Sequence, residues 1–296
     1  MEPLSDPVIR GLGVDDLEAA FELSVGAGWN QTADDWRMLF RLAPDACFAA
    51  QADDRIVGSA IGIDYGSYGW IAMMLVEPAY RGRGVGGALL EAAMGAIRAE
   101  LPIRLDATPL GRPLYQRHGF EDEATLTRYA LTAAHGPRHE RGAPHQAAHA
   151  QRLTASDLKI VIEQDKETGR TRDQLLQWAF DRAPDYCHVV HVPDRIAQYC
   201  LGRRGRLFDQ IGPVVAKDND VADALVSAAL SAAGTRQVIV DAFDEHHAFS
   251  ASLRQRGFEH QRPLYRMCRP ARQPSAPLAT TRQASIEFAI LGPEFS

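Results

Sequence analysis

Residues 73–90 read MMLVEPAYRGRGVGGALL, and this stretch decides how the rest of the chain is interpreted. An apolar run of strand length leads into a glycine-rich turn, which opens directly onto an Ala/Leu-rich segment of helical character. Glycines permit positive φ and leave backbone N–H groups uncovered by side chains. Together with the positive end of a helix dipole, such N–H groups bind phosphate oxygens, and Arg81 and Arg83 add matching charge. The stretch therefore predicts a phosphate-binding loop.

Two other kinds of glycine-rich loop are disfavoured. A dinucleotide-binding fingerprint reads Gly-x-Gly-x-x-Gly followed by an acidic residue about 20 positions on at a strand end, and we interpret the closer alternation of Gly82, Gly84 and Gly86 as evidence against it. A P-loop ends in Gly-Lys-Ser/Thr, which does not occur here. A glycine-rich helix start with a purely structural duty is the remaining alternative, and the crowding of glycine with arginine disfavours it.

The hydrophobic pattern around this loop alternates between helical and strand periods. Helices are expected over residues 15–24, 32–41, 84–100 and 113–117, and strands over 47–52, 56–63, 68–76, 103–107 and 125–131. Thr32 is positioned to cap the second of these helices. The pattern predicts a mixed α/β domain with the strand–loop–helix unit at its centre.

The sequence also repeats itself once, at an offset of about 140 residues. The matching segments are 43–47 and 183–187, 54–56 and 194–196, 105–107 and 240–242, and 119–121 and 257–259. Four matches in the same order indicate two copies of one domain. A Gly/Pro/His-rich linker separates them, so the expected parts are residues 1–132, a linker 133–150, a second copy 151–270 and a tail 271–296. The apolar end of the tail is expected to dock on the body.

Composition excludes several functional classes. The 296 residues carry a formal net charge of −6, which disfavours a nucleic-acid binder. No apolar run is long enough to cross a membrane, and the acidic N-terminus does not resemble a signal peptide. The cysteines form no CxxC pair, and the histidines of the linker fit a solvated connector better than a metal site. We expect a cytoplasmic protein without metal, nucleic-acid or membrane partners, either a monomer or a homodimer.

Two motifs resemble one family. Arg81-x-x-Gly84-x-Gly86, preceded by Val76-x-Pro78, resembles the coenzyme A pyrophosphate loop of the GNAT superfamily of acetyl-CoA-dependent N-acetyltransferases. The segment 114–120, LYQRHGF, is similar to the Leu-Tyr-x-x-x-Gly-Phe segment of that family. Together they cover most of residues 7–131. The resemblance implies two tandem GNAT-like domains, each a mixed, mostly antiparallel sheet flanked by helices.

The second copy resembles the C-terminal half of bacterial tandem GNAT proteins, which is usually degenerate. Alignment of the two loops and the two Gly-Phe pairs replaces Arg81, Gly84, Gly86 and Tyr115 by Lys217, Asp220, Ala222 and Leu253. An aspartate repels phosphate, and the lost glycines cover the backbone. We expect a supporting role for this copy.

The resemblance implies direct transfer of acetyl from acetyl-CoA to a primary amine of a small molecule. Backbone N–H groups of Met74, Leu75 and Val76 would meet the pantetheine and the thioester carbonyl, as in an oxyanion hole. The residues expected to hold the pyrophosphate are Arg81, Gly82, Arg83, Gly84, Val85, Gly86 and Gly87. Tyr115 is the expected general acid, through a hydrogen bond that strengthens as charge develops on the thiolate. Thr108 stands where the family often carries an asparagine that contacts the cofactor.

The general base and the acceptor are left open. Asp106, Asp64 and Tyr65 lie near strand ends, and a water relay is a further possibility; the recurrence of Asp106 as Asp241 favours a structural role. Trp29, in segment 28–31, and Asp165, in the corresponding segment of the second copy, are expected at the acceptor site together with Asp106. The alternatives are a catalytically silent acyl-CoA-binding or interaction module and a protein N-acetyltransferase.

Overall fold

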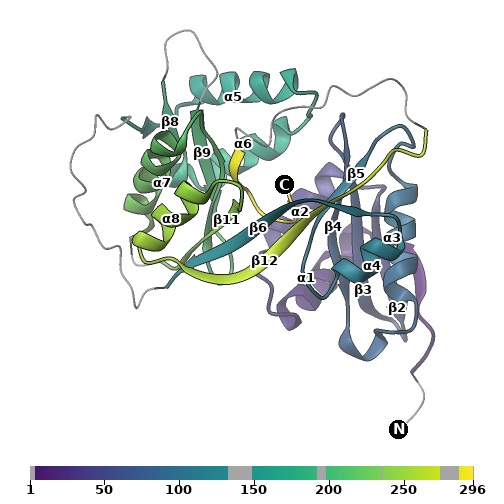
Figure 1. The fold of residues 1–296 in the computed structure, drawn as a ribbon. Helices are drawn as coiled ribbons and strands as arrows, with labels where there is room; N and C mark the ends of the chain where they lie inside the picture. The colour runs from purple at the N-terminus through teal and green to yellow at the C-terminus, as the bar shows by residue number, and fades with distance from the viewer. Residues whose placement is uncertain (1–3, 133–148, 192–197, 235, 274–286, 296) are drawn as a thin grey trace.

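The two copies share one sheet. The computed structural model describes residues 4–132, 149–191, 198–234, 236–273 and 287–295, and its thirteen strands run in the order β1-β2-β3-β4-β5-β12-β6-β11-β13-β10-β9-β8-β7 (Figure 1). The first copy supplies one end of this order and the second copy the other. The expected linker contains four histidines, and three of them, at positions 135, 139 and 145, lie outside the described residues.

The first copy begins with a short strand that the sequence pattern did not predict. Its elements are β1 (Val8–Gly11), α1 (Leu17–Gly26), α2 (Ala33–Leu42), β2 (Cys47–Ala52), β3 (Arg55–Asp64), β4 (Gly69–Val76), α3 (Val85–Gly95), β5 (Ile103–Ala107), α4 (Arg112–Arg117) and β6 (Glu121–Leu131). Thr32 caps α2 as predicted, because its hydroxyl accepts a hydrogen bond from the Asp35 N–H. Helix α3 ends at Gly95, five residues before the predicted end.

The second copy repeats this order of elements. They are β7 (Gln151–Arg152), α5 (Ala155–Glu167), α6 (Asp173–Arg182), β8 (His188–Val190), β9 (Gln198–Arg203), β10 (Asp209–Val215), α7 (Asn219–Ala233), β11 (Val238–Phe243), α8 (His247–Gln255), β12 (Glu259–Arg269) and β13 (Glu287–Ile290). Helix α7 occupies the place of α3, and α8 that of α4 (Figure 1). The mixed α/β class expected from the sequence is confirmed.

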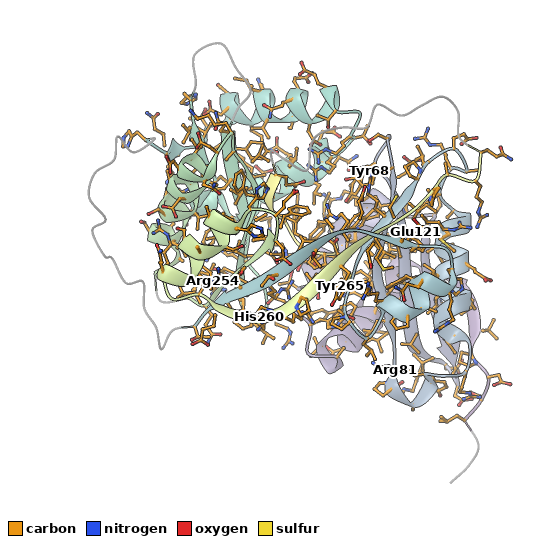
Figure 2. The ribbon with its side chains drawn as sticks, viewed as in Figure 1. Tyr68, Arg81, Glu121, Arg254, His260 and Tyr265 are labelled. Atoms are coloured by element: carbon orange, nitrogen blue, oxygen red, sulfur yellow. The ribbon has the colours of Figure 1, made fainter. Side chains whose placement is uncertain are left out.

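The copies exchange their long strands. β12 of the second copy pairs antiparallel with β5 of the first, and β6 of the first pairs antiparallel with β11 of the second. β6 and β12 also pair with each other, with Leu126 opposite Leu264. Figure 2 shows His260 near the second-copy end of β12 and Tyr265 nearer the first copy. Each half therefore completes its sheet with a strand of the other half.

Two equivalent buried ion pairs hold the exchanged strands. Arg266 on β12 donates to both carboxylate oxygens of Asp106 on β5, at 2.9 and 2.8 Å. Arg128 on β6 does the same to Asp241 on β11, at 2.6 and 2.7 Å. The side chains of both aspartates are fully buried. A buried carboxylate needs such a partner, because an unpaired charge inside a protein is strongly destabilising.

Each copy contains a pair of parallel strands that diverge. In the first copy β4 and β5 pair at Gly69–Ile103 and Trp70–Arg104. In the second, β10 and β11 pair at Asp209–Val238 and Gln210–Ile239. Strand β13, from the C-terminal tail, then lies between β10 and β11 and pairs antiparallel with both. Strand β13 thus fills the gap between β10 and β11, whereas the gap between β4 and β5 opens onto a cavity.

Candidate active site

The glycine loop presents uncovered backbone at the start of α3. Gly84 is the N-cap residue, with φ of 83°, and no side chain caps the helix. Gly82 has φ of 75°, and a Cβ at either glycine would meet no atom within 4 Å. Such positive φ values favour glycine, and the open space above the loop leaves the first N–H groups of α3 accessible. The loop has the geometry of an anion receptor.

The two loop arginines point to different places. Arg81 is exposed and lines the cavity, and its Nε donates to the Val76 carbonyl at 2.9 Å. Arg83 instead pairs with Asp6 at 2.5 Å and lies over the Tyr80 ring. Val85, also expected at the pyrophosphate, is buried in the core under the sheet. Of the predicted loop residues, those that line the cavity are Arg81, Gly82, Gly84, Gly86 and Gly87.

Strand β4 is bent where it faces the cavity. Met73 has φ of 51°, and the register against β3 shifts between Ser59 and Ile61. The Ser59 hydroxyl donates to the Met73 carbonyl at 2.7 Å and holds this bulge. The predicted Met74, Leu75 and Val76 line the cavity along the edge of β4 that has left β5. That edge offers backbone N–H groups to a ligand lying in the gap.

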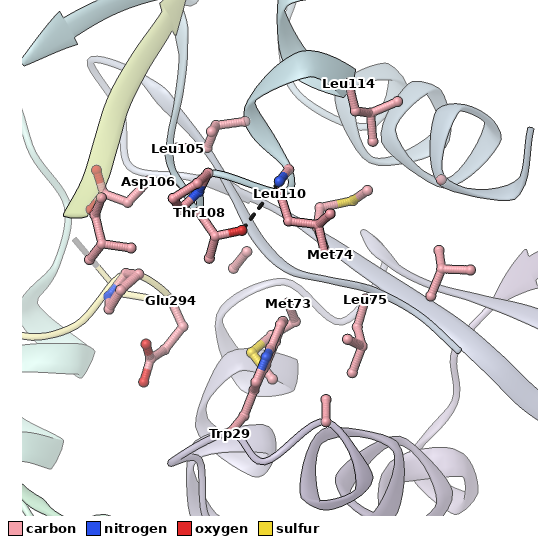
Figure 3. A pocket seen from close by; sticks show the side chains of 18 of the residues that line it. Trp29, Met73, Met74, Leu75, Leu105, Asp106, Thr108, Leu110, Leu114 and Glu294 are labelled. Carbon is pink, nitrogen blue, oxygen red and sulfur yellow. Dashed lines mark hydrogen bonds between the residues drawn. The ribbon is translucent and has the colours of Figure 1, made fainter. Parts of the chain in front are cut away.

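The cavity is large and is shared by both copies. It has a volume of about 1220 Å³. Figure 3 shows Leu114 at one side, Asp106 and Glu294 at the other, and Met74, Met73 and Leu75 between them, with Trp29 below Met73. The second-copy and tail residues that line it are Leu207, Phe208, Gln261, Arg262, Leu264, Pro293 and Glu294.

Tyr115 lies on the wall of this cavity. It comes from α4, is 8% exposed and packs edge-on against Phe120, with ring centroids 5.9 Å apart. Burial raises the pKa of its phenol. Among the described residues its hydroxyl has no hydrogen-bond partner. A protonated, unengaged phenol beside a cavity is able to donate a proton or a hydrogen bond to a bound group.

Thr108 also lines the cavity and shapes the start of α4. Its hydroxyl accepts a hydrogen bond from the Gly111 N–H at 3.2 Å (Figure 3). Gly111 lies against the Tyr115 ring, since a Cβ there would be 3.1 Å from that ring. Thr108 therefore helps to place the turn on which Tyr115 depends.

The second copy holds the segment that contains Trp29. Arg206 donates through Nη2 to the Trp29 carbonyl at 2.8 Å. The Asn30 side chain accepts from the Leu207 N–H at 2.8 Å and donates to the Phe208 carbonyl at 3.0 Å. Trp29 lines the cavity. The wall that it forms is thus fixed by residues almost 180 positions away.

The tail closes the same end. Glu294 is 3% exposed and forms a buried ion pair with Arg203 of β9, which also donates to Asp35 of α2 at 2.9 Å. Burial raises the pKa of Asp35 to about 6, against the opposing effect of Arg203. Trp70 donates to the Pro293 carbonyl at 3.2 Å. Sequence reasoning expected the tail to dock, but no short motif marks Glu294 or Arg262 as cavity residues.

The acidic and tyrosine side chains considered for the acceptor site or the general base have other partners. Asp106 lines the cavity as a residue, but its side chain is engaged by Arg266. Asp165 does not line the cavity; it pairs with Arg172 and Arg170 at 2.7 and 2.8 Å. Asp64 pairs with Arg98, and the Tyr65 hydroxyl donates to the Phe295 carbonyl. These contacts explain the fixed positions of all four residues without a proton-transfer role.

Comparison with known protein families identifies the family of this chain. Two models described as Acetyltransferase (GNAT) domain match residues 43–122 and 161–280. The chain belongs to the GNAT acetyltransferases, carries two such domains in tandem and is an acyltransferase; the resemblance drawn from the loop and the Leu-Tyr segment is confirmed. The family uses acetyl-CoA as cosubstrate.

Individual relatives agree with this assignment. The uncharacterized N-acetyltransferase YitH of Bacillus subtilis (strain 168) is 25% identical over 204 residues, covering 68% of this chain and 70% of YitH. The structure of a putative acetyltransferase from Pyrococcus horikoshii matches 100% of this chain and 99% of its own, with a TM-score of 0.75 and 23% identity. A tandem GNAT protein from the clavulanic acid biosynthesis pathway matches 92% and 99%, with a TM-score of 0.61 and 17% identity. The solved structures support the fold.

The described residues were also compared with the requirements of a membrane-spanning helix and of a metal site. None of their helices combines the length and apolar character needed to cross a bilayer. Nor do they contain a group of three or more His, Cys, Asp or Glu side chains placed to hold a metal ion.

Proposed function

We propose that the first copy binds acetyl-CoA and transfers its acetyl group to the primary amine of a small molecule. One observation carries this proposal: the glycine loop, the free edge of β4 and the Tyr115 ring line one continuous cavity. A diphosphate fits the open space above Gly82 and Gly84, where even a Cβ would meet nothing. Arg81 adds a positive charge at that end.

The residues of the cavity supply what acetyl transfer needs. Backbone N–H groups along Met74–Val76 stabilise negative charge that develops on the thioester oxygen. The raised pKa of Tyr115 keeps its phenol protonated at neutral pH, so it can donate to the departing sulfur. The mostly apolar wall around Leu105 and Leu114 excludes water from that sulfur.

The acceptor is proposed to be small because the second copy covers the cavity. Phe208, Arg262 and Glu294 line the end opposite the glycine loop, where an acceptor would enter. The loop carrying Phe208 is fixed to Asn30 by three hydrogen bonds, so it does not open without breaking them. A long protein segment would need a groove open at both ends, which makes protein N-acetylation the less favoured alternative.

The loop arginines provide a matched test. Arg81→Glu should weaken acetyl-CoA binding about tenfold to a hundredfold, since it removes one charged contact to phosphate and adds repulsion. Arg83→Glu is the control, because Arg83 points to Asp6 and does not line the cavity. Titration calorimetry with acetyl-CoA and thiol release with an amine library measure both.

The outcome separates the alternatives. A large loss for Arg81→Glu with a small loss for Arg83→Glu supports the proposed loop. Equal losses, or thiol release that survives Arg81→Glu unchanged, would overturn it. Acetyl-CoA binding without thiol release from any amine would favour a silent binding module.

A further inference from the structure

Arg262 places a cation in the cavity wall at the second-copy end. It lies on the exchanged strand β12, directly opposite Arg128 of β6, just after a shift in register at His260. Both arginines line the cavity. Like charges directly opposite each other on neighbouring strands are destabilising unless something neutralises them.

Of these two arginines, the described residues neutralise Arg128 alone. Arg128 is held by both oxygens of Asp241, which also accepts from the Gln210 amide at 2.8 Å. For Arg262 the described residues provide neither an ion pair nor a hydrogen bond, and its Nε is buried without a partner. Burial, followed by the charge of Arg128, lowers the pKa of the Arg262 guanidinium, and Asp241 and Glu294 offset this in part. Arg262 thus lacks the anion that a half-buried guanidinium requires.

A carboxylate lies at the same end of the cavity. One carboxylate oxygen of Glu294, Oε1, accepts a hydrogen bond from Arg203. Glu294 also lines the cavity. Its charge is close enough to act on both Arg262 and Arg128. The acceptor end therefore combines an unpaired cation with a carboxylate, which is the complement of a molecule that carries an anion and an ammonium.

We infer that the acceptor is an amine that also carries a small anionic group, a carboxylate or a phosphate, and that Arg262 binds this group. Arg262 acts as a specificity residue and takes no part in bond making. Its planar fork of N–H donors matches either anion in a bidentate manner. The inference rests on the proposed function and adds the chemical class of the acceptor.

Matched acceptors test this inference. Thiol release from acetyl-CoA is measured for alanine against alaninamide, β-alanine against β-alaninamide, and O-phosphoethanolamine against ethanolamine. The first two pairs report on a carboxylate and the third on a phosphate. The ratio of kcat/KM within each pair is compared between the wild type, Arg262→Gln and Arg262→Lys, so that differences in amine basicity cancel.

The expected effect follows from one charge-assisted contact. In at least one pair the anionic member should be preferred, and Arg262→Gln should reduce that ratio about tenfold or more, mainly through KM. Arg262→Lys should retain part of the preference. Arg254→Gln is the control, since Arg254 is exposed on α8 and does not line the cavity. Removal of an unpaired cation should leave the unfolding midpoint of Arg262→Gln unchanged or higher.

Three results would count against the inference. These are no preference for the anionic member in any pair, a preference that Arg262→Gln leaves unchanged, and an equal loss of preference in Arg254→Gln. Calorimetry with acetyl-CoA on the wild type distinguishes a failure of this inference from a failure of the proposed function. If acetyl-CoA binds and the preference is missing, this inference fails alone; if acetyl-CoA does not bind, the proposed function fails as well.

Discussion

The two gaps between diverging strands are built alike and used differently. In the register of the paired strands, Val214 and Val215 of β10 correspond to Met74 and Leu75 of β4. Val214 and Val215 pair with β13, whereas Met74 and Leu75 line the cavity. In the second copy the tail strand therefore occupies the position that corresponds to the cavity beside β4 in the first copy. In one fold the gap between the diverging strands is open or closed according to whether the chain's own tail fills it.

The helices that follow these gaps also differ at their N-termini: that of α3 is uncapped and that of α7 is capped by a side chain. Gly84 leaves the N-terminus of α3 without a side-chain cap. At α7 the carboxylate of Asp218 accepts from the Val221 N–H at 3.0 Å. The second copy therefore satisfies one of its first helix N–H groups with its own side chain and places a negative charge where the first copy has an uncapped helix start.

A single glycine permits the filled gap. A Cβ at Gly212 of β10 would lie 1.9 Å from the Ile290 carbonyl oxygen of β13. The φ of 153° at Gly212 is also one that other residues rarely adopt. The tail can lie in the second copy only because β10 has no side chain at this point.

The largest expected effect concerns the ion pairs that both halves share. Arg266→Met or Arg128→Met leaves a buried carboxylate without its partner and should each cost about 3–5 kcal/mol of unfolding free energy. Denaturant unfolding measures this cost. Arg55→Met is the control, because the pair of Arg55 with Glu77 is exposed and should be worth less than about 1 kcal/mol. Unequal losses at the two buried pairs would show that the exchange is held mainly by one half.

The next effect tests the asymmetry between Tyr115 and Leu253. Tyr115→Phe should lower kcat about a hundredfold by removing a proton donor, with acetyl-CoA affinity unchanged. Tyr80→Phe serves as control, since Tyr80 is buried outside the cavity lining. Steady-state kinetics and calorimetry give the two quantities. Turnover that survives in Tyr115→Phe would remove the phenol from the mechanism.

A smaller effect is expected when the second-copy residue is placed in the first-copy loop. Gly84→Asp forces a side chain into a left-handed conformation, at a cost of about 1–2 kcal/mol, and sets a negative charge near the phosphate site. Acetyl-CoA affinity should fall about tenfold or more, as measured by calorimetry. The reverse change at the equivalent N-cap of α7, Asp218→Gly, should create no second binding site because β13 fills the gap. A second site would contradict the role assigned to the tail.

The smallest effect is the absence of an alkaline limb in the pH profile. Burial raises the pKa of Tyr115, so its phenol stays protonated throughout the range below about pH 10, the ordinary value for tyrosine. The rate should rise as the acceptor amine loses its proton and should not fall again below that pH. A decline with an apparent pKa under 9 that disappears in Tyr115→Phe would contradict the raised pKa.

Much of the fold was predictable because local pattern and local structure coincide. The strands β2 and β5 have the predicted ends, and Thr32 caps α2 through neighbours three residues away. The short β1 was missed because four residues give too little alternation. The exchange of β6 and β12 was not predictable, since each strand carries the same pattern whichever sheet it joins.

The sequence by itself determined the glycine loop, the repeat, the family and the loss of Gly84 and Tyr115 in the second copy. These features depend on contiguous residues, whose backbone conformations and N–H groups are set locally. Tertiary structure alone decided which side chains meet at the acceptor end. Arg262 and Glu294 come from an exchanged strand and a tail, and only the packing of distant segments brings them to the cavity beside Trp29.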